Sequence, residues 1–193
     1  MGSFYGNVTL LGTNLEAVSA TATRPGFAFA HGDTVVVFAE EDDSEPPRSA
    51  ARLSAELECI AFSAGVHDDD IFFFEVHDRG RPVTRGAVPD PADYFGIDAE
   101  MLADIDPSVL EGQDTAMTWI GGGPPDPKSL VDALGRGDVE AVRTAVTADF
   151  VFARERHEAI VAALGLPAGA VGWGYRYLSD DGDGYEGPPL ARI

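Results

Sequence analysis

Ile71-Phe72-Phe73-Phe74-Glu75-Val76-His77 is the stretch of the sequence that decides the fold. Its aromatic and β-branched side chains predict a β-strand. Because apolar side chains stand at both odd and even positions, we expect this strand to be covered on both faces. Asp78-Arg79-Gly80 has the composition of a turn and leads to a weaker strand over 81–85, where Pro82 indicates a sheet edge.

The residues before this stretch predict further strands and two helices. Gly32-Asp33 joins two apolar segments with hairpin chemistry, and the second of them is apolar on both faces, as in the middle of a sheet. Ser44-Glu45-Pro46-Pro47 has the residues of a helix start, and an apolar stripe with spacings of three and four continues to near Gly65. In chain order we expect a strand over 4–11, a helix over 15–23 capped by Asn14, strands over 27–31 and 34–39, a helix from 44 to about 65, and strands over 71–77 and 81–85.

This succession of elements is the β-α-β-β-α-β order of a ferredoxin-like fold, in which two helices lie on one face of an antiparallel sheet. The sequence therefore predicts an α+β protein with a ferredoxin-like core over residues 1–86. The second face of such a sheet is left bare, although its central strands are apolar on both sides.

The rest of the chain predicts the cover for that face. An irregular, proline-rich connection is expected over 87–127, with one helical turn at 99–105. Three helices and a final strand should follow and pack on the core, and a symmetric homodimer is the alternative cover. These elements are predicted at 128–134, 138–147, 151–164 and 171–178, with Asp138 and Asp149 as helix caps.

Charge is the most distinctive property of the composition. The 193 residues include 33 Asp and Glu but only 13 Lys and Arg, which leaves a net charge of −20. Such a surface repels nucleic acid and anionic membranes and attracts a basic protein. The single cysteine, Cys59, forbids an internal disulfide, and the N-terminus lacks the features of a secretory signal. We therefore expect a cytoplasmic protein with no nucleic-acid or membrane partner.

Two places in the sequence carry side chains that could do chemistry. His67, Asp68 and Asp70 stand just before the strand at 71–77 and could bind a partner or hold a divalent metal, although a metal needs three or more converging ligands. His157 falls on the apolar stripe of its helix, where a histidine is more often packed in the core than catalytic. No nucleophile elbow, phosphate-binding loop, dinucleotide motif or Cys-x-x-Cys pair occurs, and the sequence identifies no cofactor.

Segments at both ends of the chain resemble an uncharacterised family of bacterial proteins of unknown function. The resemblance implies no activity and assigns no functional residue. Its segments are Gly2-Ser3-Phe4-Tyr5-Gly6-Asn7-Val8-Thr9-Leu10, residues 67–71, 150–166 and 172–177.

Three functions remain open at this level. The acidic charge and the missing catalytic motifs favour a non-catalytic binding protein, such as an immunity protein or a decoy inhibitor of a basic partner. A metal-assisted hydrolase would use His67, Asp68, Asp70 and His157. A small-ligand sensor would need an apolar pocket, with Phe72, Phe74, Trp173 or Tyr175 in its lining. Whether the protein is an enzyme is left open by the sequence.

Overall fold

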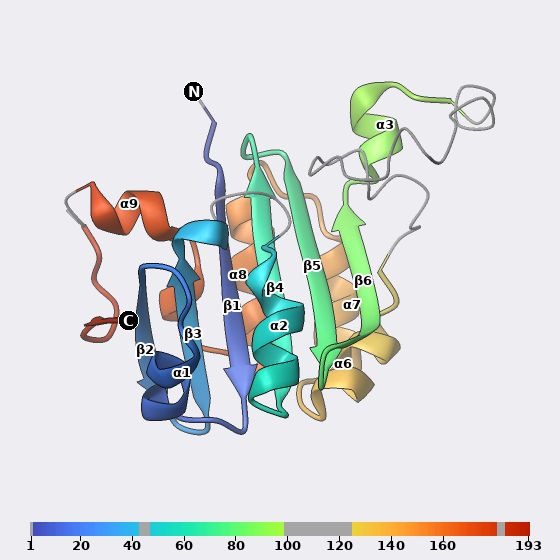
Figure 1. The fold of residues 1–193 in the computed structure, drawn as a ribbon. Coiled ribbons are helices and arrows are strands. Elements are labelled where there is room, and N and C mark those ends of the chain that lie inside the picture. The colour runs from blue at the N-terminus through green and yellow to red at the C-terminus, as the bar shows by residue number, and fades with distance from the viewer. Residues whose placement is uncertain (1, 43–46, 99–124, 181–183) are drawn as a thin grey trace.

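The protein is built on a seven-stranded sheet in which every adjacent pair of strands is antiparallel (Figure 1). The computed structural model describes residues 2–42, 47–98, 125–180 and 184–193. The strands run in the order β6-β5-β4-β1-β3-β2-β7. Their bounds are β1 Tyr5–Leu11, β2 Gly26–His31, β3 Thr34–Ala39, β4 Ile60–His67, β5 Ile71–Asp78, β6 Arg81–Val88 and β7 Ala191–Arg192.

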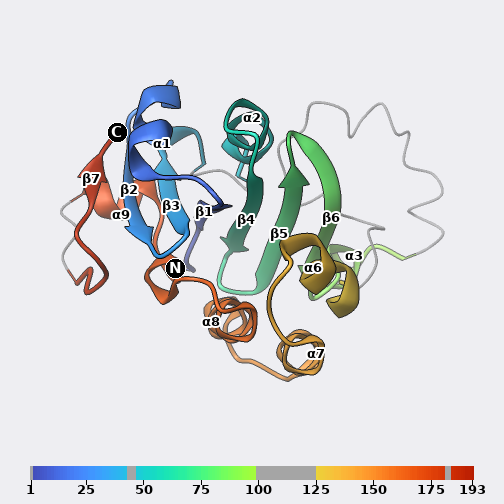
Figure 2. The same ribbon diagram turned by 90° about the horizontal axis from the view of Figure 1, so that it is seen from below.

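The centre of the sheet has the predicted ferredoxin-like order. Helix α1 (Leu15–Thr21) connects β1 to β2, and α2 (Ser49–Glu56) connects β3 to β4. These elements give the strand order β4-β1-β3-β2, with both helices on one face (Figures 1 and 2). The hairpin β5–β6 extends the sheet beside β4, and β7 extends it beside β2. The α+β, ferredoxin-like prediction is therefore confirmed, with strands added at both edges.

The prediction was wrong about which segment forms the fourth strand of this core. The second helix ends at Glu56 instead of continuing to Gly65, and the backbone reverses at Glu58, whose φ is 49°. Strand β4 then begins at Ile60. Its residues lie against β1 on one side and β5 on the other and are buried on both faces, so they show no alternation of apolar and polar side chains.

Local capping explains where the first two helices begin. The Asn14 side chain accepts a hydrogen bond from the Ala17 N–H, as predicted for α1. At α2 the buried Asp42 carboxylate accepts from the Ser49 N–H at 2.8 Å. An acidic side chain thus faces the positive end of this helix. The predicted helix start at 44–47 falls largely on residues 43–46, outside the described ranges.

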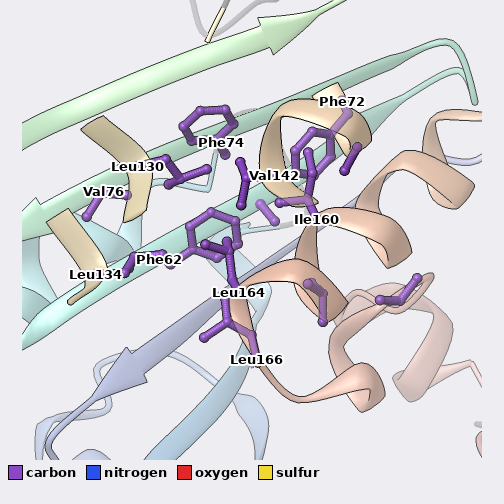
Figure 3. Close-up of a cluster of buried hydrophobic side chains, with 14 of the residues drawn as sticks. Phe62, Phe72, Phe74, Val76, Leu130, Leu134, Val142, Ile160, Leu164 and Leu166 are labelled. Atoms are coloured by element: carbon purple, nitrogen blue, oxygen red, sulfur yellow. The ribbon is translucent and has the colours of Figure 1, made fainter. Parts of the chain in front are cut away.

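Three C-terminal helices cover the second face of the sheet, as predicted. They are α6 (Pro127–Leu134), α7 (Val139–Thr147) and α8 (Ala153–Leu164), and Figure 2 shows them opposite α1 and α2. Asp138 caps α7 as expected, whereas α8 begins after Phe152 and not at Asp149. Side chains of the helices and of β4 and β5 interdigitate in one buried cluster (Figure 3), which includes Phe62, Phe72, Phe74, Leu130, Val142, Ile160 and Leu164.

The predicted final strand at 171–178 is wrong in position. Residues Tyr175–Ser179 form the short helix α9, and the last strand is β7, at the end of the chain. Trp173, Tyr175 and Tyr177 alternate in sequence as strand residues do, but Gly172 takes a φ of 81°, and the residues after it form a helix whose Leu178 packs on β2 and β3. The remaining described elements are the helix α3 (Pro91–Phe95) and the 3-10 segments η1 (Glu40–Asp42) and η3 (Ala168–Ala170). The predicted helical turn at 99–105 lies outside the described residues.

Candidate functional site

The turn between β4 and β5 carries three consecutive carboxylates, Asp68, Asp69 and Asp70. Asp68 and Asp69 have φ values of 50° and 63°, in the left-handed region that favours glycine or asparagine. The Asp70 N–H donates to the His67 carbonyl at 2.9 Å and closes the turn. Glycine would relax this backbone, and aspartate is among the few other residues that adopt it at low cost.

Three other segments of the chain meet at this turn, at the end of the sheet where β1 begins (Figure 1). The Asp69 N–H donates to the Ser3 carbonyl at 3.2 Å, and the Asp69 carbonyl accepts from the Ala153 N–H at the start of α8. The Tyr94 hydroxyl of α3 donates to the Asp70 carboxylate at 3.2 Å. The turn is therefore held by the N-terminal segment, by α3 and by α8.

Aromatic rings surround the imidazole of His67 beside the turn. The ring of Phe4 lies edge-on at 5.0 Å between centroids, and those of Tyr94 and Phe95 lie at 6.5 and 6.4 Å. Tyr94 and Phe95 also contact each other edge-to-face at 5.0 Å. His67 is thus packed among rings, and this contact fixes α3 next to the acidic turn.

Large apolar side chains are exposed on both flanks of the turn. Tyr94 and Phe95 are 38% and 40% exposed, and Val151 and Phe152, directly before Ala153, are 77% and 51% exposed. Four of the five large hydrophobic residues that stand out as exposed in the described chain thus gather around this turn. We call Asp68, Asp69, Asp70, Tyr94, Phe95, Val151 and Phe152 the acidic-aromatic surface.

The carboxylates of this surface form no ion pair within the described structure. Within the described ranges, no Lys, Arg or His side chain forms an ion pair with Asp68, Asp69 or Asp70. Desolvation, together with the hydrogen bond to Asp70, raises the pKa of Tyr94, which keeps its hydroxyl a donor to that carboxylate. Unpaired carboxylates beside exposed rings can bind a guanidinium or an ammonium group by ion pairing and cation–π contact.

His157 does not join this surface. Its imidazole is completely buried, between the rings of Tyr5 at 5.7 Å and Phe72 at 5.1 Å. Its Nδ1 lies 2.9 Å from the Tyr5 hydroxyl, and its Nε2 has no partner in the described structure. Burial, with a smaller effect of the Arg154 charge, lowers the pKa of His157 to about 3. The residue is a neutral core histidine on the inner face of α8, as its position in the sequence indicates.

The described residues give no support to a metal centre at His67, Asp68 and Asp70. Across those residues, no group of three or more His, Cys, Asp or Glu side chains is placed to hold a metal ion. The aromatic side chains proposed to line a small-ligand pocket also do not lie together. Phe72 and Phe74 are buried in the core, Tyr175 contacts Phe27 at 5.8 Å, and Trp173 lines a different cavity.

Comparison with known proteins adds no relative: no family profile, curated protein or solved structure matches the chain. The resemblance to an uncharacterised bacterial family therefore stays a prediction. Among the described residues, no helix combines the length and the apolar character needed to cross a membrane.

Sequence reasoning found the acidic half of the surface and missed the apolar half. Tyr94 and Phe95 are an aromatic pair within an acidic, proline-rich segment, and this isolation was a usable signal of exposure. Val151 and Phe152 were instead included in the helix that follows, where apolar residues normally face the core. Only the structure shows that α8 begins after them.

Proposed function

We propose that this protein is a non-catalytic binding protein that docks a basic protein partner on its acidic-aromatic surface. The observation that carries the proposal is the group of three unpaired carboxylates between two pairs of exposed apolar side chains. An immunity protein or a decoy inhibitor, which masks a positively charged site on its target, is the kind of protein that fits this chemistry.

Two physical properties support a basic partner over other ligands. The net charge of −20 raises the encounter rate with a cationic protein and disfavours nucleic acid. The exposed rings supply apolar contact area at the point of docking, where interfaces concentrate aromatic residues. Self-association through the same surface would bring like charges together, so a homodimer through this surface is disfavoured.

Arginine fits the surface better than lysine. Its planar guanidinium can bind a carboxylate through two hydrogen bonds and stack on an aromatic face, whereas an ammonium is a more strongly hydrated point charge. Asp70 and Tyr94, joined by a hydrogen bond, place a carboxylate and a ring next to each other. We therefore propose that the partner presents arginine side chains here.

Titration calorimetry with two peptides tests this proposal directly. An arginine-rich peptide and its lysine counterpart of equal charge are titrated into the full-length protein and into the Asp68→Asn/Asp70→Asn variant. Asparagine keeps the left-handed backbone of Asp68 and removes the charge. The variant should bind the arginine peptide about tenfold more weakly, and the wild type should prefer arginine to lysine.

The matched control is Glu16→Gln/Glu140→Gln, which removes two charges from the exposed surfaces of α1 and α7. It should change the affinity less than about twofold, because distant exposed charges act only through a screened field. Equal losses in the two variants would show that the net charge, and not the acidic-aromatic surface, attracts the peptide.

A cytoplasmic location belongs to the same proposal. Its support is the single cysteine, Cys59, which is buried and forms no disulfide. Fractionation of the cells that produce the protein is the test, and recovery outside the cytoplasm would contradict it.

A further inference from the structure

A second site shares no lining residue with the acidic-aromatic surface. A cavity of about 300 Å³ opens between α8, the segment around η3 and the C-terminal segment at 184–187. Among the residues that the structure describes, its charged and aromatic lining consists of Arg154, Glu158, Trp173 and Glu186. A volume of this size is at the lower end of small-molecule sites.

The charged side chains of the cavity are not paired with each other. Arg154 and Glu158 lie one turn apart on α8, at a spacing where an ion pair can form. In the part of the chain that the structure describes, neither side chain makes a hydrogen bond or an ion pair, and the same holds for Glu186. From the described residues, one guanidinium and two carboxylates are therefore available to a ligand.

A glycine makes room for the guanidinium. Gly172 has a φ of 81°, and a Cβ at this position would lie 2.8 Å from the Arg154 Nε. Any other residue at 172 would both strain the backbone and displace the arginine side chain. The close approach of this backbone holds the guanidinium beside the cavity wall.

An aromatic pair forms another part of the wall. Trp173 lines the cavity and contacts Tyr185 edge-to-face at 5.2 Å between ring centroids. Gly187 also lines the cavity, and a Cβ there would lie 2.3 Å from the Tyr185 hydroxyl. The C-terminal segment is thus packed closely onto the ring that supports Trp173.

From this lining we infer that the cavity binds a small zwitterion with an apolar side chain, of the class of free α-amino acids. The carboxylate of the ligand pairs with Arg154, its ammonium group with Glu158 and Glu186, and its side chain packs on Trp173. A simple anion meets two carboxylates and a simple cation meets the guanidinium, so the mixed charge of the site selects a ligand with both. The inference does not rest on the proposed basic partner.

Tryptophan fluorescence gives a direct readout of binding. In full-length protein carrying Trp119→Phe, Trp173 is the single tryptophan. L-phenylalanine and L-leucine are titrated, together with phenethylamine and isopentylamine, which lack the carboxylate, and 3-phenylpropanoate and 4-methylpentanoate, which lack the ammonium group. At least one amino acid should change the emission saturably, and both of its analogues should bind at least about tenfold more weakly.

Two variants test which charged residue of the cavity binds which charged group of the ligand. Arg154→Gln should lower the affinity for the amino acid at least about tenfold and leave the affinity for the amine unchanged or higher. Glu158→Gln should lower the affinity for the amino acid but not the affinity for the carboxylate analogue. Arg143→Gln, at an exposed position of α7 outside the cavity, is the control for the loss of one arginine. A thermal melt of each variant without ligand separates loss of binding from loss of folding.

The inference is overturned if neither amino acid binds saturably at millimolar concentration, or if an amine or an acid binds as tightly as its amino acid. Failure here with intact binding of the arginine peptide would leave the proposed function standing. The reverse result would remove the proposed function and leave this site.

Discussion

His157 shows how burial decides the protonation state of a single residue. In the folded protein its pKa is about 3, because the imidazole is desolvated between Tyr5 and Phe72. In the unfolded chain the pKa is about 6.5. Between these values the unfolded chain binds a proton that the folded protein does not, so stability rises with pH in this window. The contribution of the neutral His157 to the unfolding free energy is complete above about pH 6.5 and is lost as the pH falls toward 3.

Replacing this histidine by phenylalanine should therefore flatten the acid side of the stability curve. Between about pH 7.5 and pH 5, proton binding to the unfolded chain at His157 should cost the wild type about 2 kcal/mol of unfolding free energy. The His157→Phe variant has no imidazole at this position and does not lose this free energy. The difference in unfolding free energy between wild type and variant should therefore shrink by that amount at the lower pH. Urea unfolding at both pH values measures it.

His31→Gln is the control for the loss of one imidazole, because His31 is exposed at the end of β2. Parallel curves for the wild type and His157→Phe would contradict the buried, neutral state of the imidazole.

At the scale of elements, the sequence was informative wherever local chemistry and tertiary packing agree. Caps such as Asn14 and Asp138, the hairpin at Gly32-Asp33 and the strand at 71–77 all appear in the structure. The prediction was wrong for the segment Ile60–His67, because its small and apolar residues suit a buried strand and a helix equally well. Neighbouring strands on both sides decide its conformation, and that information is not local.

The candidate site also has one part that the sequence predicts and another part that only the tertiary structure brings together. The run of aspartates at 68–70 is visible in the sequence, because its chemistry needs no partner to be recognised. Tyr94 and Phe95 come near it only through the pairing of β4, β5 and β6 and the packing of α3, which no local pattern specifies. The cavity at Arg154 likewise requires the last residues of the chain to return to α8.

Two hairpin glycines separate the cost of backbone conformation from that of packing. Gly32 joins β2 to β3 with a φ of 60°, and beyond its two chain neighbours no residue has an atom within 4 Å of where a Cβ would be. Gly80 joins β5 to β6 with a φ of 78°, and a Cβ there would lie 2.7 Å from the Cβ of Ala55 on α2. Only the second hairpin touches a helix at its glycine.

We expect Gly32→Ala to lower the unfolding free energy by about 1 kcal/mol, the cost of a left-handed alanine. Gly80→Ala should cost about 1–3 kcal/mol more, because the methyl group must also displace α2 from the hairpin. Denaturant unfolding of the two variants against wild type gives both values. Equal losses would mean that α2 moves away freely and does not hold the β5–β6 hairpin.

At the scale of the whole molecule, the fold places its apolar and charged groups in separate regions. Helices on both faces of the sheet bury the apolar clusters of β1, β3, β4 and β5. The surplus of acidic residues in the composition is consequently carried at the surface, where carboxylates repel one another. This arrangement makes the same charges unfavourable for the free protein and favourable for a complex with a cation.

Salt should therefore change stability and binding in opposite directions. Raising NaCl from about 20 mM to about 500 mM shortens the Debye length from about 20 Å to about 4 Å, which screens the self-repulsion. If screening adds about 1 kcal/mol to the unfolding free energy, the melting temperature rises by about 2–4 °C, as calorimetry would show. The affinity for the arginine peptide should fall at least about tenfold over the same range.

KCl should reproduce both effects, since screening depends on ionic strength and not on which monovalent cation supplies it. A melting temperature that falls with salt would show that attractive ion pairs outweigh the repulsion, and the net charge would then be no measure of the field around the protein. An affinity that resists salt would place the binding energy in the exposed rings of Tyr94, Phe95 and Phe152 rather than in the three aspartates. Only opposite responses of folding and binding fit a surface whose unneutralised charge destabilises the free protein and attracts its partner.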